Sequence, residues 1–157
     1  GSLYFTGFER IRSDSSNYTK EIQESVLRMI LNGSRDTKVV SYLREKIEGV
    51  KRCKIQDIAI AKTLSRNRDE YEKNQQNYIL ALQSSKFEIT QGESINIVPA
   101  RNYPFGVAVF KDVEDLPKKI EVDWEEVIEK QIRAKVEDLL SLVGLSWEEI
   151  KGQKRLL

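Results

Sequence analysis

The segment Lys62-Thr63-Leu64-Ser65-Arg66 places two cations and two hydroxyl groups within five residues. Ammonium, guanidinium and hydroxyl groups bind phosphate oxygens without distinguishing one base from another. The alternative is structural: Ser65 or Asn67 caps a following helix, and Arg66 is only solvated. The residue types therefore predict a phosphate contact in this segment, with a helix cap as the competing interpretation.

Other cations extend this prediction less specifically. Arg12 stands two residues before Asp14, so we expect the guanidinium to face a phosphate backbone while Asp14 caps the first helix. A plain cap with a solvated Arg12 is the alternative. The cluster Lys51-Arg52-x-Lys54, together with Lys73 and Arg101, is ambiguous in the same way, because most basic side chains are simply exposed to water.

The residue inventory argues against catalysis and metal binding. The chain has no histidine and one cysteine, Cys53, which excludes a His-based triad, a zinc finger and an intramolecular disulfide. We expect Cys53 to be a partly buried thiol, and we interpret Asp112-x-Glu114-Asp115 as a solvated acidic loop. Trp124 and Trp147 begin helices beside apolar stripes, which favours packing over base stacking. An independent enzyme is the least favoured class.

Length and charge set further limits. The 157 residues fit one domain, and 39% hydrophobic with 32% charged residues is typical of a globular protein without a membrane span. Net charge is only +1, but residues 1–86 carry 16 basic and 11 acidic residues (+5), whereas residues 87–157 carry 10 and 14 (−4). A basic half can face phosphates while the acidic half faces water, because phosphate attraction is local. We expect Gly1-Ser2 to be an expression scar, 3–152 the domain and 153–157 a tail.

The spacing of apolar residues predicts an α+β fold, mostly helical, with a small central β-sheet. The expected helices lie at about 14–32, 37–49, 68–73, 78–82, 123–144 and 146–150, and the expected strands at 58–60, 95–98 and 107–110. The first two helices are expected to pair as an antiparallel hairpin across Gly33.

Three blocks of the sequence follow one another in a recognisable order. They are Gly7-Phe8-Glu9-Arg10-Ile11-Arg12-Ser13-Asp14, Leu64-Ser65-Arg66-Asn67-Arg68-Asp69-Glu70-Tyr71 and Asp123-Trp124-Glu125-Glu126-Val127-Ile128-Glu129-Lys130-Gln131-Ile132. Together they resemble the carboxy-terminal thumb region of archaeal-type family B DNA polymerases. In that family the blocks read Gly-Leu-Glu-x-x-Arg-Arg-Asp-Trp, Ile-Thr-Arg-Asp-x-x-x-Tyr and Asp-x-x-Tyr-Tyr-Ile-Glu-Asn-Gln-Val. Ser13, Ser15 and Lys130 replace an arginine, a tryptophan and an asparagine of the family.

The resemblance implies a thumb domain that binds the backbone of primer-template duplex DNA and supports processive replication. It places the family's Thr-Arg pair on Ser65 and Arg66. The expected DNA contacts are Arg12, Lys62, Thr63, Ser65, Arg66 and Lys73. No Tyr-x-Asp-Thr-Asp motif occurs in the chain, so the catalytic carboxylates and their Mg²⁺ are expected only in a palm region outside it. We expect no cofactor and no nucleotidyltransferase activity in this chain alone.

The same resemblance implies the partners. They are primer-template DNA and the palm and fingers, either in cis or as a separate subunit of a split enzyme, in an intracellular, cytoplasmic and nucleoid-associated setting. The tail Gln153-Lys154-Arg155-Leu156-Leu157 begins like a sliding-clamp peptide but stops before any aromatic pair. The alternative function is a protein-interaction module that docks on a palm subunit or a sliding clamp.

Overall fold

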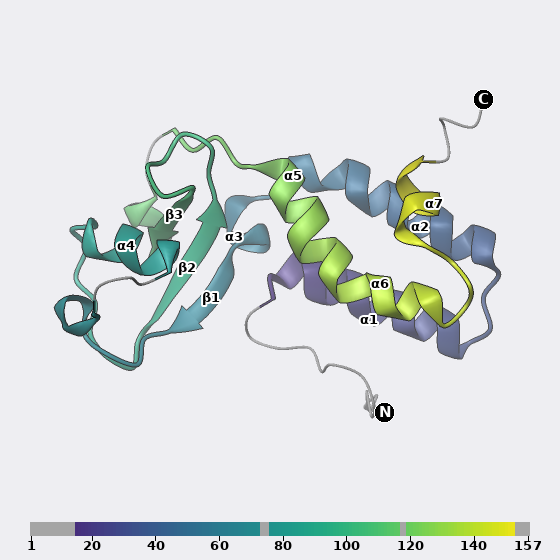
Figure 1. Cartoon of the computed structure of the whole chain (residues 1–157), viewed down its shortest axis with the longest axis horizontal. Helices are drawn as coiled ribbons and strands as arrows, with labels where there is room; N and C mark the ends of the chain where they lie inside the picture. The colour runs from purple at the N-terminus through teal and green to yellow at the C-terminus, as the bar shows by residue number, and fades with distance from the viewer. Residues whose placement is uncertain (1–14, 73–75, 117–118, 153–157) are drawn as a thin grey trace.

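A computed structural model describes residues 15–72, 76–116 and 119–152. It consists of a helical bundle joined to a three-stranded sheet (Figure 1), so the mostly helical α+β fold with a small sheet is confirmed. Arg12, Asp14, Lys73 and the tail 153–157 lie outside the described residues. The elements are α1 Asn17–Leu31, α2 Asp36–Gly49, η1 Val50–Arg52, α3 Ile55–Ile58, β1 Ile60–Thr63, η2 Arg68–Glu70, α4 Asn77–Gln83, β2 Ser94–Pro99, β3 Val107–Phe110, η3 Val113–Asp115, α5 Trp124–Glu126, η4 Val127–Ile132, α6 Arg133–Ser141 and α7 Trp147–Gly152.

Helix α1 begins after Ser16, so the predicted cap at Asp14 is wrong. The Ser16 backbone is extended, and its Oγ accepts a hydrogen bond from the Thr19 amide at 3.1 Å, which is the geometry of an N-cap. The predicted antiparallel hairpin of α1 and α2 is confirmed. Gly33 turns the chain with φ of 71°, and the Tyr18 hydroxyl at the start of α1 donates to the Lys46 carbonyl near the end of α2 at 2.7 Å.

Two hydrophobic clusters lie on opposite faces of the antiparallel sheet, whose strand order is β1-β2-β3. Side chains alternate between faces along a strand. Ala108 and Phe110 of β3 therefore join the larger cluster, which the helical bundle builds around fully buried residues such as Leu140. Val109 joins the smaller cluster, together with Leu82 of α4. The sheet is thus the layer between the bundle and α4.

The strand predicted at 58–60 is displaced toward the C-terminus. Ile58 ends helix α3 and is fully buried in the larger cluster, while the strand runs from Ile60 to Thr63. In the antiparallel pairing of β1 with β2, Lys62 lies opposite Ile95 and Thr63 lies opposite Ser94. The helix predicted near 68–73 is the single 3-10 turn η2 within the described residues. The predicted strands at 95–98 and 107–110 and the helix at 78–82 are confirmed as β2, β3 and α4.

The late helix is continuous from Trp124 to Ser141 but changes its winding in the middle. Asp123 caps it, since its Oδ1 accepts the Glu126 amide at 3.1 Å. Residues Val127–Ile132 form a π-helical segment, η4, with hydrogen bonds from i to i+5, between the α-helical α5 and α6. The predicted last helix is α7. A capping box begins it, because the Ser146 Oγ accepts the Glu149 amide and the Glu149 carboxylate accepts the Ser146 amide, both at 3.2 Å.

Ion pairs hold α7 against the late helix. Arg133 contacts the carboxylates of Glu137 at 2.9 Å, and of Glu129 and Glu148 at 3.2 Å. Partial burial would raise the pKa of Glu129, but hydrogen bonds from Lys151, Trp147 and Arg133 lower it, and the net shift is downward. Within the described ranges, no helix combines the length and the apolar character needed to cross a membrane.

Candidate nucleic-acid interface

The predicted phosphate-binding segment 62–66 runs along β1 and into the loop before η2. Leu64, only 2% exposed, anchors it in the smaller hydrophobic cluster. Thr63 lies exposed on one face of the sheet, where its Oγ1 is 3.1 Å from the Ser94 Oγ. Lys62 points to the opposite face, and its Nζ lies 5.6 Å from the centre of the Tyr78 ring on α4. The structure therefore does not place the Lys62 and Thr63 side chains together.

Ser65 and Arg66 occupy an exposed turn whose backbone is fixed by hydrogen bonds to the Tyr71 hydroxyl. The amides of both residues donate to the Tyr71 hydroxyl, at 3.1 and 3.3 Å. Nothing in the described part of the chain pairs with the Arg66 guanidinium or the Ser65 hydroxyl. With the backbone fixed and both side chains in solvent, the turn presents one cation and one hydroxyl outward.

The competing cap interpretation is confirmed for Asn67 and not for Ser65. Asn67 caps η2 in a reciprocal box with Glu70, whose carboxylate accepts the Asn67 amide at 2.9 Å. The Asn67 side chain also accepts the Gln91 amide at 2.7 Å, which ties the turn to the loop before β2. The cap and an outward Arg66 therefore coexist, because different residues supply them.

Arg68, two residues further on, has a structural role that sequence reasoning missed. Its Nε donates to the Leu82 carbonyl at 3.0 Å, and its Nη2 donates to the Ser85 hydroxyl at 3.0 Å and to the Phe87 carbonyl. The guanidinium also lies 5.4 Å from the centre of the Phe87 ring. These acceptors lie at the end of α4 and just beyond it, so no local motif in the sequence indicates them.

A small hollow of about 230 Å³ lies at the start of α1 and beside Ile60, the first residue of β1. Lys130 and Lys135 of the late helix line it opposite Ser15, Ser16 and Thr19. Among the described residues, the buried Ser15 Oγ and Gln131 Oε1 have no hydrogen-bond partner. The first turn of α1 carries no acidic residue, so the positive end of its helix dipole is not neutralised there and favours an anion. Sequence reasoning missed this hollow because its two walls come from opposite ends of the chain.

A larger hollow of about 810 Å³ gathers cations that the sequence leaves far apart. Lys51, Arg101 and Lys151 line it beside the partly exposed Trp124. Glu121 and Glu125 line it as well, and Arg101 lies 3.7 Å from the Asp123 carboxylate. Its charge is therefore mixed.

The two tryptophans differ in exposure. Trp147 is 2% exposed in the larger cluster, which confirms the packing interpretation. Trp124 packs against the same cluster at its edge.

The acidic residues beside the sheet are neutralised locally. The Lys111 ammonium lies 2.6 Å from the Glu93 carboxylate. Hydrogen bonds from Lys111 and from the Thr90 amide and hydroxyl lower the pKa of Glu93 to about 2. Glu93 directly precedes Ser94, so this pairing keeps an uncompensated negative charge away from the Thr63 and Ser94 hydroxyls.

The remaining candidates have structural explanations. Asp112 and Asp115 form a capping box around η3, as a surface loop does. In the ranges that the structure covers, no cluster of three histidine, cysteine or acidic side chains is arranged to hold a metal ion. Cys53 is a free, half-buried thiol, as predicted, 3.8 Å from the Gly49 carbonyl.

Comparison with known proteins supports the resemblance seen in the sequence. The chain matches DNA polymerase 2 of Aeropyrum pernix with 28% identity over 163 residues, covering 99% of this chain and 20% of the polymerase. Its fold matches the family B DNA polymerase of the hyperthermophilic archaeon Pyrobaculum calidifontis with a TM-score of 0.65 and 24% identity, covering 85% of this chain and 18% of that one. No family model matches the chain.

These matches define the class: the chain is similar, over nearly its whole length, to one region of archaeal family B DNA polymerases. The resemblance to that family is confirmed. The chain spans about a fifth of the length of the polymerases it matches.

Proposed function

We propose that this chain is the thumb portion, or a thumb-like small subunit, of a family B DNA polymerase, and that it binds primer-template duplex DNA through the phosphate backbone. The observation that carries the proposal is the strip along β1. It leads from the hydroxyl-lined hollow at the start of α1, past the exposed Thr63 and Ser94, to the outward Ser65 and Arg66. From Ile60 to Arg66 it spans at most about 20 Å.

The strip matches a nucleic-acid backbone in chemistry and in length. Phosphates recur at about 3.4 Å of axial rise along each strand, so 20 Å accompanies roughly six nucleotides. Hydroxyls, a helix N-terminus and an arginine bind phosphates without reading sequence. The expected role is to slow dissociation of the duplex and so support processive synthesis. Catalytic carboxylates with Mg²⁺ would belong to a palm region outside this chain.

The test is fluorescence anisotropy of a labelled primer-template duplex at several salt concentrations. Each phosphate contact contributes about −0.9 to the slope of log affinity against log salt. We expect the double variant Lys62→Ala/Arg66→Ala to bind more weakly and to reduce that slope. The single variants Lys62→Ala and Arg66→Ala then show how much of the lost affinity belongs to the Arg66 turn and how much to Lys62 on the α4 face. The control Arg35→Ala/Lys38→Ala removes the same charge at the start of α2, in the bundle.

Equal loss in the control pair would indicate a general charge effect, and an unchanged slope in the Lys62/Arg66 pair would contradict the proposed contact. Circular dichroism and the unfolding midpoint must be unchanged for the comparison to hold. Binding that is equally tight for unrelated duplex sequences is also expected, because the strip offers no base-reading geometry.

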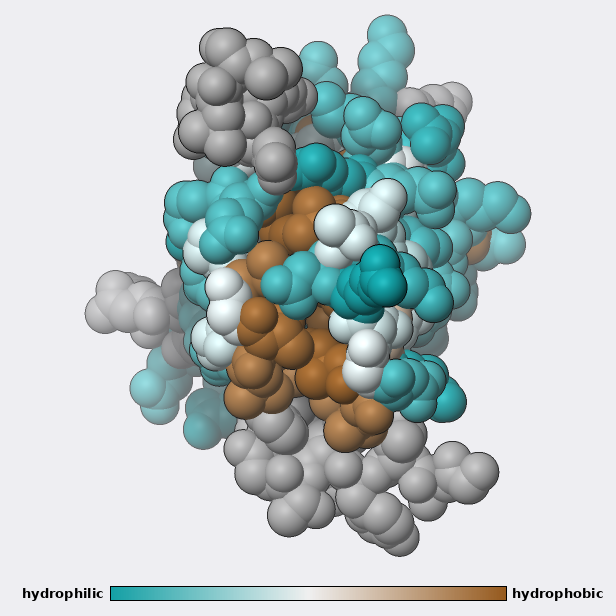
Figure 2. Space-filling model, turned by 90° about the vertical axis from the view of Figure 1, so that its right-hand side faces the viewer, coloured by the Kyte–Doolittle hydropathy of each residue, from teal (hydrophilic) through white to brown (hydrophobic). Residues whose placement is uncertain are grey.

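A second candidate function is protein docking, and one observation favours it. Figure 2 shows an apolar patch on the end of the molecule where α1 and α6 terminate. Leu31, the last residue of α1, is 62% exposed, and Leu142, directly after α6, is 53% exposed. Large exposed apolar side chains gathered in one place mark protein contacts. Such a module would dock on a polymerase palm subunit or a sliding clamp.

The docking alternative is tested with a direct probe. The Aeropyrum polymerase lacking the fifth of its chain that matches this one is immobilised, and binding of the present chain is followed by surface plasmon resonance. Docking predicts binding that survives Lys62→Ala/Arg66→Ala and is lost in Leu31→Lys/Leu142→Lys. Loss only in the former pair would instead assign the interaction to the charged strip.

A further inference from the structure

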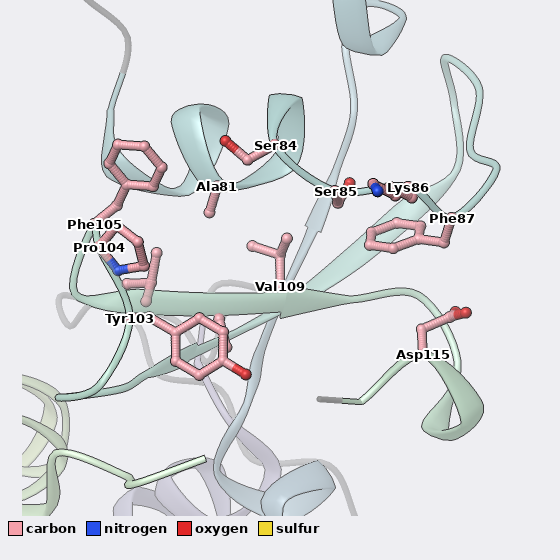
Figure 3. A pocket seen from close by; sticks show the side chains of 12 residues that line it. Ala81, Ser84, Ser85, Lys86, Phe87, Tyr103, Pro104, Phe105, Val109 and Asp115 are labelled. Carbon is pink, nitrogen blue, oxygen red and sulfur yellow. The ribbon is translucent and has the colours of Figure 1, made fainter. Parts of the chain in front are cut away.

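The groove between α4 and β3 is an apolar cavity at the other edge of the sheet. It has a volume of about 510 Å³, within the range of pockets that bind ligands. In Figure 3, Val109 points up from β3 toward Ala81 on α4, Phe105 bounds one end, and Phe87 bounds the other. The cavity is therefore long enough to take apolar side chains along the direction of the strand.

Strand β3 is an edge strand of the described sheet, and its ladder directs the amides and carbonyls of alternate residues away from β2 and toward this groove. The Ala100 amide donates to the Gly106 carbonyl at 2.9 Å, which sets the phase of the antiparallel β2–β3 ladder. The hydrogen-bonded pairs that follow are Val98 with Ala108 and Asn96 with Phe110. The amides and carbonyls of Val107 and Val109 must then point away from β2.

The β1–β2 ladder confirms this phase independently. The Leu64 amide donates to the Glu93 carbonyl at 2.8 Å, so Ile95 and Ile97 are the β2 residues bonded to β1. Residues of a central strand alternate between their two neighbours, which again assigns Asn96 and Val98 to β3. No hydrogen bond among the described residues reaches the outward groups of Val107 and Val109.

We propose that this groove binds an extended peptide segment of a partner protein as a fourth strand on β3. The segment would run antiparallel to β3, and the two residues opposite Val109 and Val107 would insert apolar side chains beneath α4. Edge-strand addition supplies affinity through main-chain hydrogen bonds and specificity through pockets for alternate side chains. This proposal does not depend on DNA binding, because it uses the opposite edge of the sheet.

Charge at the rim specifies the segment further. Lys86 stands exposed at the Phe87 end of the groove and pairs with no described residue. The nearby Asp115 carboxylate is already engaged by the Asp112 amide at 2.9 Å. In an antiparallel segment the residue two positions before the first inserted side chain points to the same face of the sheet and reaches this end. The partner is therefore an extended segment in which one acidic and then two apolar side chains occupy three alternate positions.

The experiment uses the full chain and a fluorescein-labelled, capped peptide Glu-Thr-Phe-Thr-Val-Thr, followed by fluorescence anisotropy. Saturable binding is expected, with roughly tenfold stronger hydrogen-exchange protection of the Val107 and Val109 amides at saturation. The same peptide N-methylated at its phenylalanine and valine keeps the side chains and loses two ladder donors. It should bind at least about tenfold more weakly.

Two variants locate the binding site. Ala81→Phe fills the groove and should abolish binding, whereas the matched Ala81→Ser should retain it. Lys86→Glu should weaken the peptide by roughly fivefold and should favour the peptide with lysine in place of its glutamate. Absence of saturable binding, equal affinity of the N-methylated peptide, or unchanged binding to a folded Ala81→Phe chain would each overturn the proposal.

Discussion

At the scale of single residues, two neighbouring arginines illustrate how position decides the role of a cation. Arg66 is exposed on a turn whose backbone the Tyr71 hydroxyl fixes. Arg68 is half-buried and donates to three acceptors at the end of α4 and just beyond it. The Arg66 guanidinium is available to an external anion, whereas the Arg68 guanidinium is engaged in hydrogen bonds within the fold.

Replacing Arg68 tests this division. We expect Arg68→Met to lower the free energy of unfolding by roughly 2 kcal/mol, because carbonyl acceptors at the end of α4 lose a charged donor. Arg66→Met, the matched control, should stay within about 0.5 kcal/mol of the wild type. Urea denaturation followed by circular dichroism measures both. Equal destabilisation by the two variants would contradict the assignment.

The start of α1 offers a second pair of adjacent residues. Ser16→Ala removes the N-cap and should cost about 1 kcal/mol. Ser15→Ala removes a buried hydroxyl that no described residue pairs with, so it should be neutral or slightly stabilising. Thermal unfolding of both variants checks the prediction. A larger loss for Ser15→Ala would mean that the cap has been assigned to the wrong serine.

At the scale of elements, the Glu93–Lys111 pair connects the loop before β2 to the end of β3. The pKa of Glu93 falls from its ordinary 4.5 to about 2, first through the Lys111 hydrogen bond and then through the Thr90 amide and hydroxyl. A carboxylate with a lowered folded pKa stabilises the fold above its unfolded pKa. That stabilisation is lost as pH falls through the folded value.

The expected pH dependence follows from that sign. The difference in urea midpoint between wild type and Glu93→Gln should be constant above pH 4.5 and should shrink toward zero as pH falls to about 2. The difference in urea midpoint between wild type and Lys111→Met, which removes the first cause of the pKa shift, should shrink over the same pH window. A difference that does not change across this range would contradict the pairing in solution.

Local sequence signals predicted most elements but not their exact limits. The β-branched residues of β2 and β3 and the apolar stripe of the late helix were sufficient, because each pattern has the period of a single kind of element. Ile58 was assigned to the strand because isoleucine suits both structures, and burial in the bundle core decided for α3. Lys62 and Thr63 were not predicted as strand because their side chains are polar. An edge strand such as β1 admits polar residues on an open face.

The candidate site was predictable only where it is continuous in sequence. The segment from Lys62 to Arg66 lies on one strand and one turn, and its residue types were sufficient to single it out. The hollow beside Ser15 and Lys130 needs the bundle to bring α1 and the late helix together. No local pattern encodes that approach.

At the scale of the whole molecule, the two hydrophobic clusters are unequal. Among the described residues the larger has 22 buried members and the smaller has six. We expect Leu82→Ala, in the smaller cluster, to cost about 2 to 5 kcal/mol and to accelerate hydrogen exchange mainly in α4 and β3. Leu43→Ala, equally buried in the larger cluster, should accelerate exchange throughout. Uniform acceleration by both variants would show a single cooperative unit instead.

The π-helical segment Val127–Ile132 has a consequence for how this chain tolerates changes in length. A π segment winds more slowly than the roughly 100° per residue of an α-helix, so it takes up one extra residue over nearly the same rotation. Deleting one residue there would therefore restore continuous α-helix and leave Val136 and Leu140 of α6 facing the core. Deleting one residue within α6 itself would instead turn the residues beyond it by about 100°. The middle of the late helix is thus a position where the bundle can absorb a change of one residue in length.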